Sequence, residues 1–146
     1  MSFWNLFSPS KREREEDFIR QLFHLALADN DLDQVELAYI HKIGKKLGMS
    51  DLRIDELQTN SEEDLRYLAP PSGERFFSIF YLINLILVDD EVHEDEIKIA
   101  HHMVMKLGYT PDTVDTILET IQYNKQQDIP VEETYQHLKK RIARVD

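Results

Sequence analysis

Apolar side chains recur at three- and four-residue spacing along most of the chain, which is the pattern of amphipathic helices. No segment shows the strict alternation of apolar and polar residues that indicates a half-buried strand. The most apolar stretch, Phe76 to Val88, has 13 residues, whereas a helix that crosses a bilayer needs about 20. The pattern therefore predicts an all-α fold in which residues 76–88 form a buried helix.

The same pattern returns after sixty residues. When residues 18–50 are aligned with residues 78–110, ten of the 33 pairs are identical. The identical pairs are Ile19/Ile79, Leu22/Leu82, Leu25/Leu85, Leu27/Leu87, Asp29/Asp89, Glu36/Glu96, His41/His101, Lys46/Lys106, Leu47/Leu107 and Gly48/Gly108. Apolar helix positions and turn residues thus coincide, which predicts two duplicated three-helix units at about residues 18–60 and 78–120.

Turn and cap residues divide the chain into seven to eight predicted helices within a single domain of residues 11–146. The predicted helices cover residues 11–28, 34–47, a third from Ser50, a short one capped by Ser61, then 74–88, 94–107, one from Thr110 and a last one from about Pro130. Gly48 and Gly108 are expected in the left-handed conformation that ends a helix. Residues 1–10 form a separate apolar segment before the domain.

Composition narrows the classes of partner. The formal net charge of −11 repels phosphate backbones, so we expect no nucleic-acid binding and favour cations or basic partners. The chain has no cysteine, which excludes disulfides and thiolate chemistry. The N-terminus lacks the pattern of an export signal, so we expect a cytoplasmic protein.

Acidic residues gather at two corners, each between the first and second helix of a unit. Asp33 and Glu36 fit a capping box, and Glu96 stands at the matching position after His93. Helix initiation therefore explains these residues without a ligand. It does not explain the carboxylates that precede them at a helix C-terminus, where the helix dipole is unfavourable.

A hard divalent cation such as calcium or magnesium would offset that cost, because carboxylate oxygens are its preferred ligands. The candidate metal ligands are Asp29, Asp31, Asp33, Glu36, Asp89, Glu91, His93 and Glu96. A loose acidic surface exposed to water is the alternative. An EF-hand is excluded, since Gln34 stands where the loop needs glycine and Ile40 where it needs glutamate.

Both corners read Ala/Val-Asp-x-Asp/Glu-apolar-x-x-x-Glu and lead into a helix that ends in Leu-Gly, and in this they resemble the tellurite-resistance TerB-like family. The resemblance covers nearly the whole chain. It implies an all-helical fold of two related units, acidic motifs that bind divalent metal, and a bacterial stress-response role in the cytoplasm or at the membrane. The family's usual corner is Asp-Gly, whereas this chain has Asp29-Asn30 and Asp89-Asp90.

Enzyme signatures are missing from the sequence. It has no Gly-rich phosphate loop, no His-Glu-x-x-His and no Glu-x-x-His pair. We therefore expect a non-enzymatic binding module that acts through protein partners. The alternatives are a metal-independent protein-interaction adaptor and an unrecognised metal-dependent enzyme.

Two further groups of residues have competing explanations. His41 and His101 flank the apolar stripe of the second helix in each unit, where half-buried packing is the favoured role over metal binding. Phe3, Trp4 and Phe7 precede a basic stretch, so residues 1–10 could rest on the inner membrane face. The favoured alternative is that this segment covers an apolar groove of the domain itself.

Overall fold

Every regular element among residues 8–28, 32–70, 74–88 and 92–142, which the computed structural model describes, is an α-helix. The seven helices of these residues are α1 (Lys11–Ala26), α2 (Gln34–Lys46), α3 (Asp51–Thr59), α4 (Arg75–Ile86), α5 (Glu94–Lys106), α6 (Pro111–Gln126) and α7 (Val131–Ile142). The predicted all-α fold is confirmed. Residues 1–7, which contain the apolar cluster of the N-terminus, lie outside the described residues.

Local sequence sets most helix ends. The hydroxyl of Ser50 accepts a hydrogen bond from the Arg53 N–H at the start of α3. Pro111 occupies the first turn of α6, but the Thr110 side chain makes no capping hydrogen bond. Gly48 and Gly108 have φ angles of 85° and 92°, so both adopt the predicted left-handed conformation after α2 and α5.

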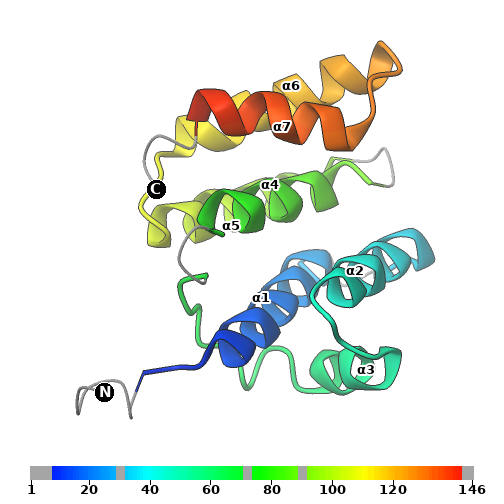
Figure 1. The fold of residues 1–146 in the computed structure, drawn as a ribbon, viewed down its shortest axis with the longest axis vertical. Helices are drawn as coiled ribbons and strands as arrows, with labels where there is room; N and C mark the ends of the chain where they lie inside the picture. Colours follow the sequence, from blue (N-terminus) through cyan, green and yellow to red (C-terminus); the bar gives the residue numbers. More distant parts are fainter. Residues whose placement is uncertain (1–7, 29–31, 71–73, 89–91, 143–146) are drawn as a thin grey trace.

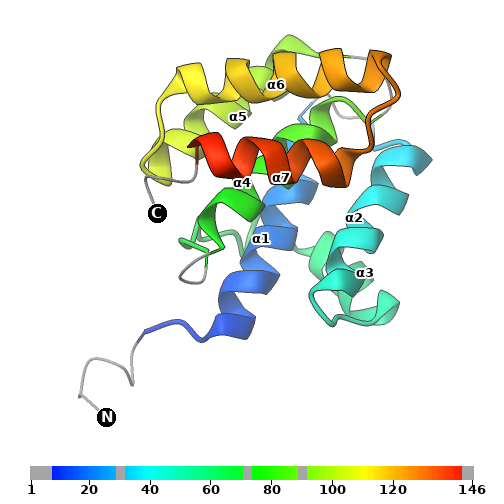
Figure 2. The ribbon, with the colours of Figure 1, turned by 45° about the horizontal axis from the view of Figure 1, so that its top comes forward.

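Helix α4 is the centre of the molecule. Ten of its 12 residues are buried, as expected for a helix that is apolar on all sides. It packs against α1, α5, α6 and α7, while α2 and α3 pack against α1. Figure 1 shows α1, α2 and α3 in the lower part of the molecule and α4 to α7 above them, and Figure 2 shows α7 in front of α4. The buried helix predicted at residues 76–88 is therefore confirmed.

The two predicted units occupy the expected places along the chain. Helices α2 and α5 each have 13 residues and begin sixty residues apart, and α1 and α4 also end sixty residues apart. The third helices differ in length, since α3 has nine residues and α6 has 16. Duplication remains our interpretation of this spacing.

The segment that joins the units differs from the prediction. Residues 60–64 form turns and residues 65–70 have no regular structure, so the short helix predicted after Ser61 is wrong. The reason is a long-range interaction, because the fully buried carboxylate of Asp17 on α1 accepts 2.8 Å hydrogen bonds from the N–H groups of Arg66 and Leu68. These bonds hold residues 66–68 of the segment against α1. We call residues 60–70 the linker.

Candidate functional site

The first acidic corner leads into α2 through a capping box. The Asp33 carboxylate accepts a 2.8 Å hydrogen bond from the Glu36 N–H, and the Asp33 N–H donates to Glu36 Oε1 at 3.5 Å. Glu36 is only 3% exposed. The predicted helix-starting role of these two residues is thus confirmed.

The second acidic corner leads into α5 with different chemistry. His93 stands at the cap position but makes no capping hydrogen bond, and its Nε2 lies 3.9 Å from Glu96 Oε1. Glu96 is 1% exposed, so a buried glutamate occupies the same place in both units. Histidine replaces aspartate as the neighbour of that carboxylate.

The structure tests the predicted metal ligands only in part. Four of them lie outside the described residues, namely Asp29, Asp31, Asp89 and Glu91. Among the residues that are described, no group of three or more histidine, aspartate or glutamate side chains could hold a metal ion. The full ligand set, and the meeting of the two corners, stay predictions.

The two matching histidines connect helices within their units. Nδ1 of His41 lies 2.8 Å from Asp51 and its Nε2 lies 3.1 Å from Asp55, which ties α2 to α3. His101 makes the corresponding contact from α5 to Asp115 on α6 at 3.3 Å. Hydrogen bonds from His41 and then Lys45 hold the pKa of Asp51 below its usual value. Both histidine side chains are partly buried, as predicted.

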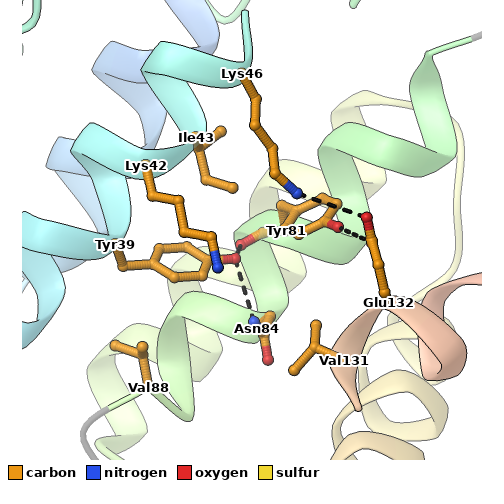
Figure 3. A pocket seen from close by; sticks show the side chains of 9 residues that line it. All are labelled: Tyr39, Lys42, Ile43, Lys46, Tyr81, Asn84, Val88, Val131 and Glu132. Carbon is orange, nitrogen blue, oxygen red and sulfur yellow. Dashed lines mark hydrogen bonds and ion pairs between the residues drawn. The ribbon is translucent and has the colours of Figure 1, made fainter.

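A groove between α2, α4 and α7 is a second candidate site. Its cavity of about 450 Å³ is lined by residues from all three helices (Figure 3). We call it the α2/α4/α7 groove, and its lining residues are Tyr39, Lys42, Ile43, Lys46, Tyr81, Asn84, Val88, Val131 and Glu132. Apolar side chains of α2 and α7 and the rings of two tyrosines make up much of its wall.

The hydroxyl groups of two tyrosines make hydrogen bonds on the polar side of this groove. The Tyr39 hydroxyl donates to the Tyr81 carbonyl at 2.7 Å and accepts from Asn84 Nδ2 at 3.3 Å. The Tyr81 hydroxyl donates to Glu132 Oε2 at 3.0 Å. Burial raises the pKa of both phenols well above the usual tyrosine value, so both stay protonated at neutral pH.

The two lysines of the groove have different surroundings. The Lys46 ammonium lies 3.6 Å from Glu132 and 5.3 Å from the centre of the Tyr81 ring. Lys42 makes no ion pair or hydrogen bond with any described residue, and Figure 3 shows its side chain running along the groove toward the Tyr39 hydroxyl. Among the described residues, no carboxylate pairs with the Lys42 ammonium of the groove.

Sequence reasoning did not find the α2/α4/α7 groove. Its residues come from three distant segments, and only Lys46 belongs to an identical pair of the repeat. The available signal was a difference between the units, because Tyr39 and Lys42 align with Ile99 and His102.

The chain is acidic, and every regular element of its described residues is an α-helix. None of the helices in the described part of the chain is long and apolar enough to span a membrane. A model of the family described as "Tellurite resistance protein TerB" matches residues 3–59, which include α1, α2 and α3. The resemblance to the TerB-like family is thereby supported over these residues. No curated protein and no solved structure matched the chain.

Proposed function

We propose that the protein is a non-enzymatic, TerB-like stress-response module whose paired acidic corners bind a divalent cation. The observation that carries the proposal is the burial of Glu36 and Glu96 at equivalent positions, each shortly after the corner carboxylates in the sequence. A buried carboxylate is costly unless hydrogen bonds or a cation compensate its charge. Two such groups at the same place in both units suit a cation held by carboxylate oxygens.

Calcium and magnesium are the first candidates, since both prefer oxygen ligands. The residues that would hold the ion are the eight corner residues predicted from the sequence. In this proposal the cation orders the corners and thereby changes how the module binds protein partners in the cytoplasm. The chain itself carries out no chemical step.

Calorimetric titration of the full chain with calcium, magnesium, manganese and zinc tests the proposal. The Asp29→Asn/Asp89→Asn variant removes one carboxylate from each corner and changes the net charge from −11 to −9. We expect at least one ion to bind the wild-type chain and to bind this variant about tenfold more weakly or worse, because each ligand oxygen contributes to affinity.

The matched control is Glu63→Gln/Asp112→Asn, which makes the same change in net charge at two exposed residues. If the cation binds specifically at the corners, this control should bind it with an affinity within about twofold of that of the wild type. Equal weakening in both variants would instead indicate a diffuse acidic surface. If no ion binds the wild-type chain, a metal-independent adaptor is the better description.

A further inference from the structure

Helices α4 and α7 run antiparallel where they contact each other. Near the start of α7, Glu132 accepts a 3.0 Å hydrogen bond from the Tyr81 hydroxyl. Three residues further along α7, the Tyr135 ring stacks on the ring of Phe76, with centroids 5.7 Å apart. Position along α7 thus increases as position along α4 decreases, so the end of α7 lies beside the start of α4.

The start of α1 joins these two helix ends. The Lys11 ammonium lies 3.7 Å from the carboxylate of Glu74, the residue immediately before α4. Figures 1 and 2 both show the start of α1, the start of α4 and the end of α7 on the same side of the molecule. We call this surface the basic end, and its cationic residues are Lys11, Arg12, Arg14, Arg75, Lys139, Lys140 and Arg141.

Charge is distributed unevenly between the basic end and the rest of the chain. The basic end has seven cationic residues, whereas its helix ends contain three acidic ones, Glu13, Glu15 and Glu74, which leaves a formal charge of +4. Since the whole chain has a charge of −11, all other residues together carry −15. Both Lys140 and Arg141 are exposed on the last turn of α7. The basic end is thus a cationic surface on a protein that is otherwise strongly acidic.

The acidic corners follow the opposite ends of α1 and α4. At about 1.5 Å per residue, the 16 residues of α1 span about 24 Å and the 12 residues of α4 about 18 Å. At physiological ionic strength, charges in water are screened over about 8 Å. An anionic surface in contact with the basic end would therefore be attracted by the nearby cations, while its repulsion by the corners would be largely screened.

Apolar residues precede the basic end in the sequence. Phe3, Trp4 and Phe7 stand shortly before Ser8, the first described residue. Stable attachment to a membrane generally needs two signals, such as an apolar anchor and a basic patch, because one short apolar group alone binds only marginally. In this chain the two signals are adjacent, at the start of α1.

We propose that the basic end docks on the surface of a bilayer that contains anionic phospholipid. Cations of α1 and α7 face the lipid phosphates, and the aromatic residues before α1 enter the interface. The opposite ends of α1 and α4, which lead into the acidic corners, lie away from the membrane. A nucleic acid would also attract the cations, but it offers no apolar phase for the aromatic residues. The proposal does not depend on cation binding at the corners.

Co-sedimentation of the full chain with phospholipid vesicles, without divalent ions, tests the proposal. The vesicles contain phosphatidylcholine alone, or phosphatidylcholine with about 30% of the anionic lipid phosphatidylglycerol. At about 0.15 M salt we expect binding to the anionic vesicles to be at least about tenfold tighter than to the neutral ones, and about fivefold weaker again at about 0.5 M salt. The proposal is overturned if the anionic vesicles are not bound, or are bound no better than the neutral ones.

The variant Lys140→Gln/Arg141→Gln removes two charges from the basic end. Its matched control is Lys42→Gln/Lys98→Gln, which makes the same change in net charge, from −11 to −13, at two exposed residues elsewhere. A basic residue beside an anionic membrane contributes about fivefold to affinity, so the first variant should bind at least about tenfold more weakly. The control should stay within about threefold of wild type. Equal weakening of the two variants would overturn docking through the basic end.

Fluorescence identifies the docked surface, because Trp4 is the only tryptophan of the chain. On anionic vesicles its emission should shift to shorter wavelength, and lipids with brominated acyl chains should quench it. Binding that leaves Trp4 unquenched would overturn the proposed orientation. An emission that is already shifted in the free protein and does not change with vesicles would place the segment against the domain and also overturn the proposal. Tighter binding to duplex DNA than to anionic vesicles would assign the basic end to nucleic acid instead.

Discussion

Asp17 is fully buried although it belongs to one of the most charged stretches of the chain, residues 11–17. Its carboxylate accepts hydrogen bonds from the backbone of Arg66 and Leu68 and from the Gln21 amide at 3.1 Å. The bonds to the linker join α1 to a segment about fifty residues away. The path of the linker, and with it the position of Tyr67, depends on this one side chain.

The Asp17→Ala substitution is therefore expected to lower the free energy of unfolding by about 2–4 kcal/mol, because two backbone N–H groups lose a charged acceptor. Urea unfolding followed by circular dichroism measures the change. Asp64→Ala, at an exposed residue of the same linker, should change stability by less than about 0.5 kcal/mol. Equal losses in the two variants would contradict the role assigned to Asp17.

Residues with local partners could be predicted from the sequence, and residues with distant partners could not. Asp33 caps α2 together with Glu36, three residues away, and this pattern is visible in the sequence. The burial of Asp17 is not visible, because its acceptor role is fixed by backbone groups 49 and 51 residues away. From composition alone, the charged run that contains Asp17 would be assigned to the solvent-exposed face of a helix.

At the scale of helices, the packing of α2 on α3 depends on a glycine. A Cβ atom added to Gly44 would lie 2.5 Å from Cδ1 and 2.8 Å from Cγ1 of Ile54, which is fully buried. In the second unit the equivalent positions are Val104 and Val114, both fully buried. The contact between the second and third helix is thus filled by a glycine and an isoleucine in the first unit and by two valines in the second.

Gly44→Ala is expected to destabilise the protein by about 1 kcal/mol. Overpacking costs about 1–3 kcal/mol, whereas the better helix propensity of alanine returns about 1 kcal/mol. In an Ile54→Val background the same substitution should cost less, since Cδ1 is gone and only the 2.8 Å approach to Cγ1 remains. A double-mutant cycle from denaturant unfolding measures this coupling. Additive effects of the two substitutions would contradict the proposed clash.

Helix starts and ends were largely predictable because they depend on neighbouring residues. Ser50 and Gly48 have the predicted conformations, and α2 begins at Gln34 as expected. The short helix after Ser61 was predicted wrongly, because the linker N–H groups of Arg66 and Leu68 instead donate hydrogen bonds to Asp17. Tertiary contacts decided the structure where local preference was weak.

At the scale of the whole molecule, glutamates of α1 that pair with arginines connect this helix to α3 and to the linker. The pKa of Glu16 lies below its usual value because Arg53 on α3 donates hydrogen bonds of 2.7 and 2.8 Å to it. The pKa of Glu13 is lowered by the Ser10 N–H and by Arg66 of the linker. When the pKa of a carboxyl group is lower in the folded than in the unfolded state, the group stabilises the protein at pH values above its unfolded-state pKa. This stabilisation is lost as the pH falls through the folded-state pKa.

Glu16→Gln should lower the free energy of unfolding at pH 7 by about 1 kcal/mol, a modest loss because the Arg53 side chain is partly exposed. The difference from wild type should shrink as pH falls below about 4.5, the usual glutamate value, since protonated glutamate resembles glutamine. Urea unfolding at a series of pH values from 7 to 3 measures this. Glu119→Gln, at an exposed residue of α6, is the control and should show no pH-dependent difference. A difference that stays constant down to pH 3 would contradict the ion pair's contribution.

The candidate sites differ in how far sequence could predict them. The acidic corners are continuous in sequence, so their carboxylates are visible as a motif, although the geometry of Asp29 and Asp89 is not described. The residues that line the α2/α4/α7 groove are scattered between positions 39 and 132, and only the folded chain places them side by side.

The match to the family ends at Thr59, but the contacts of α1 do not. Helix α1 packs on α4 and α5, and Asp17 holds the backbone at Arg66 and Leu68, all beyond that residue. A fragment excised at the border of the match would expose this surface and leave a carboxylate that lacks its donors. The region that matches the family is therefore smaller than the region that α1 needs for its contacts. The ends of a shortened protein should be chosen from these contacts and not from the ends of the family match.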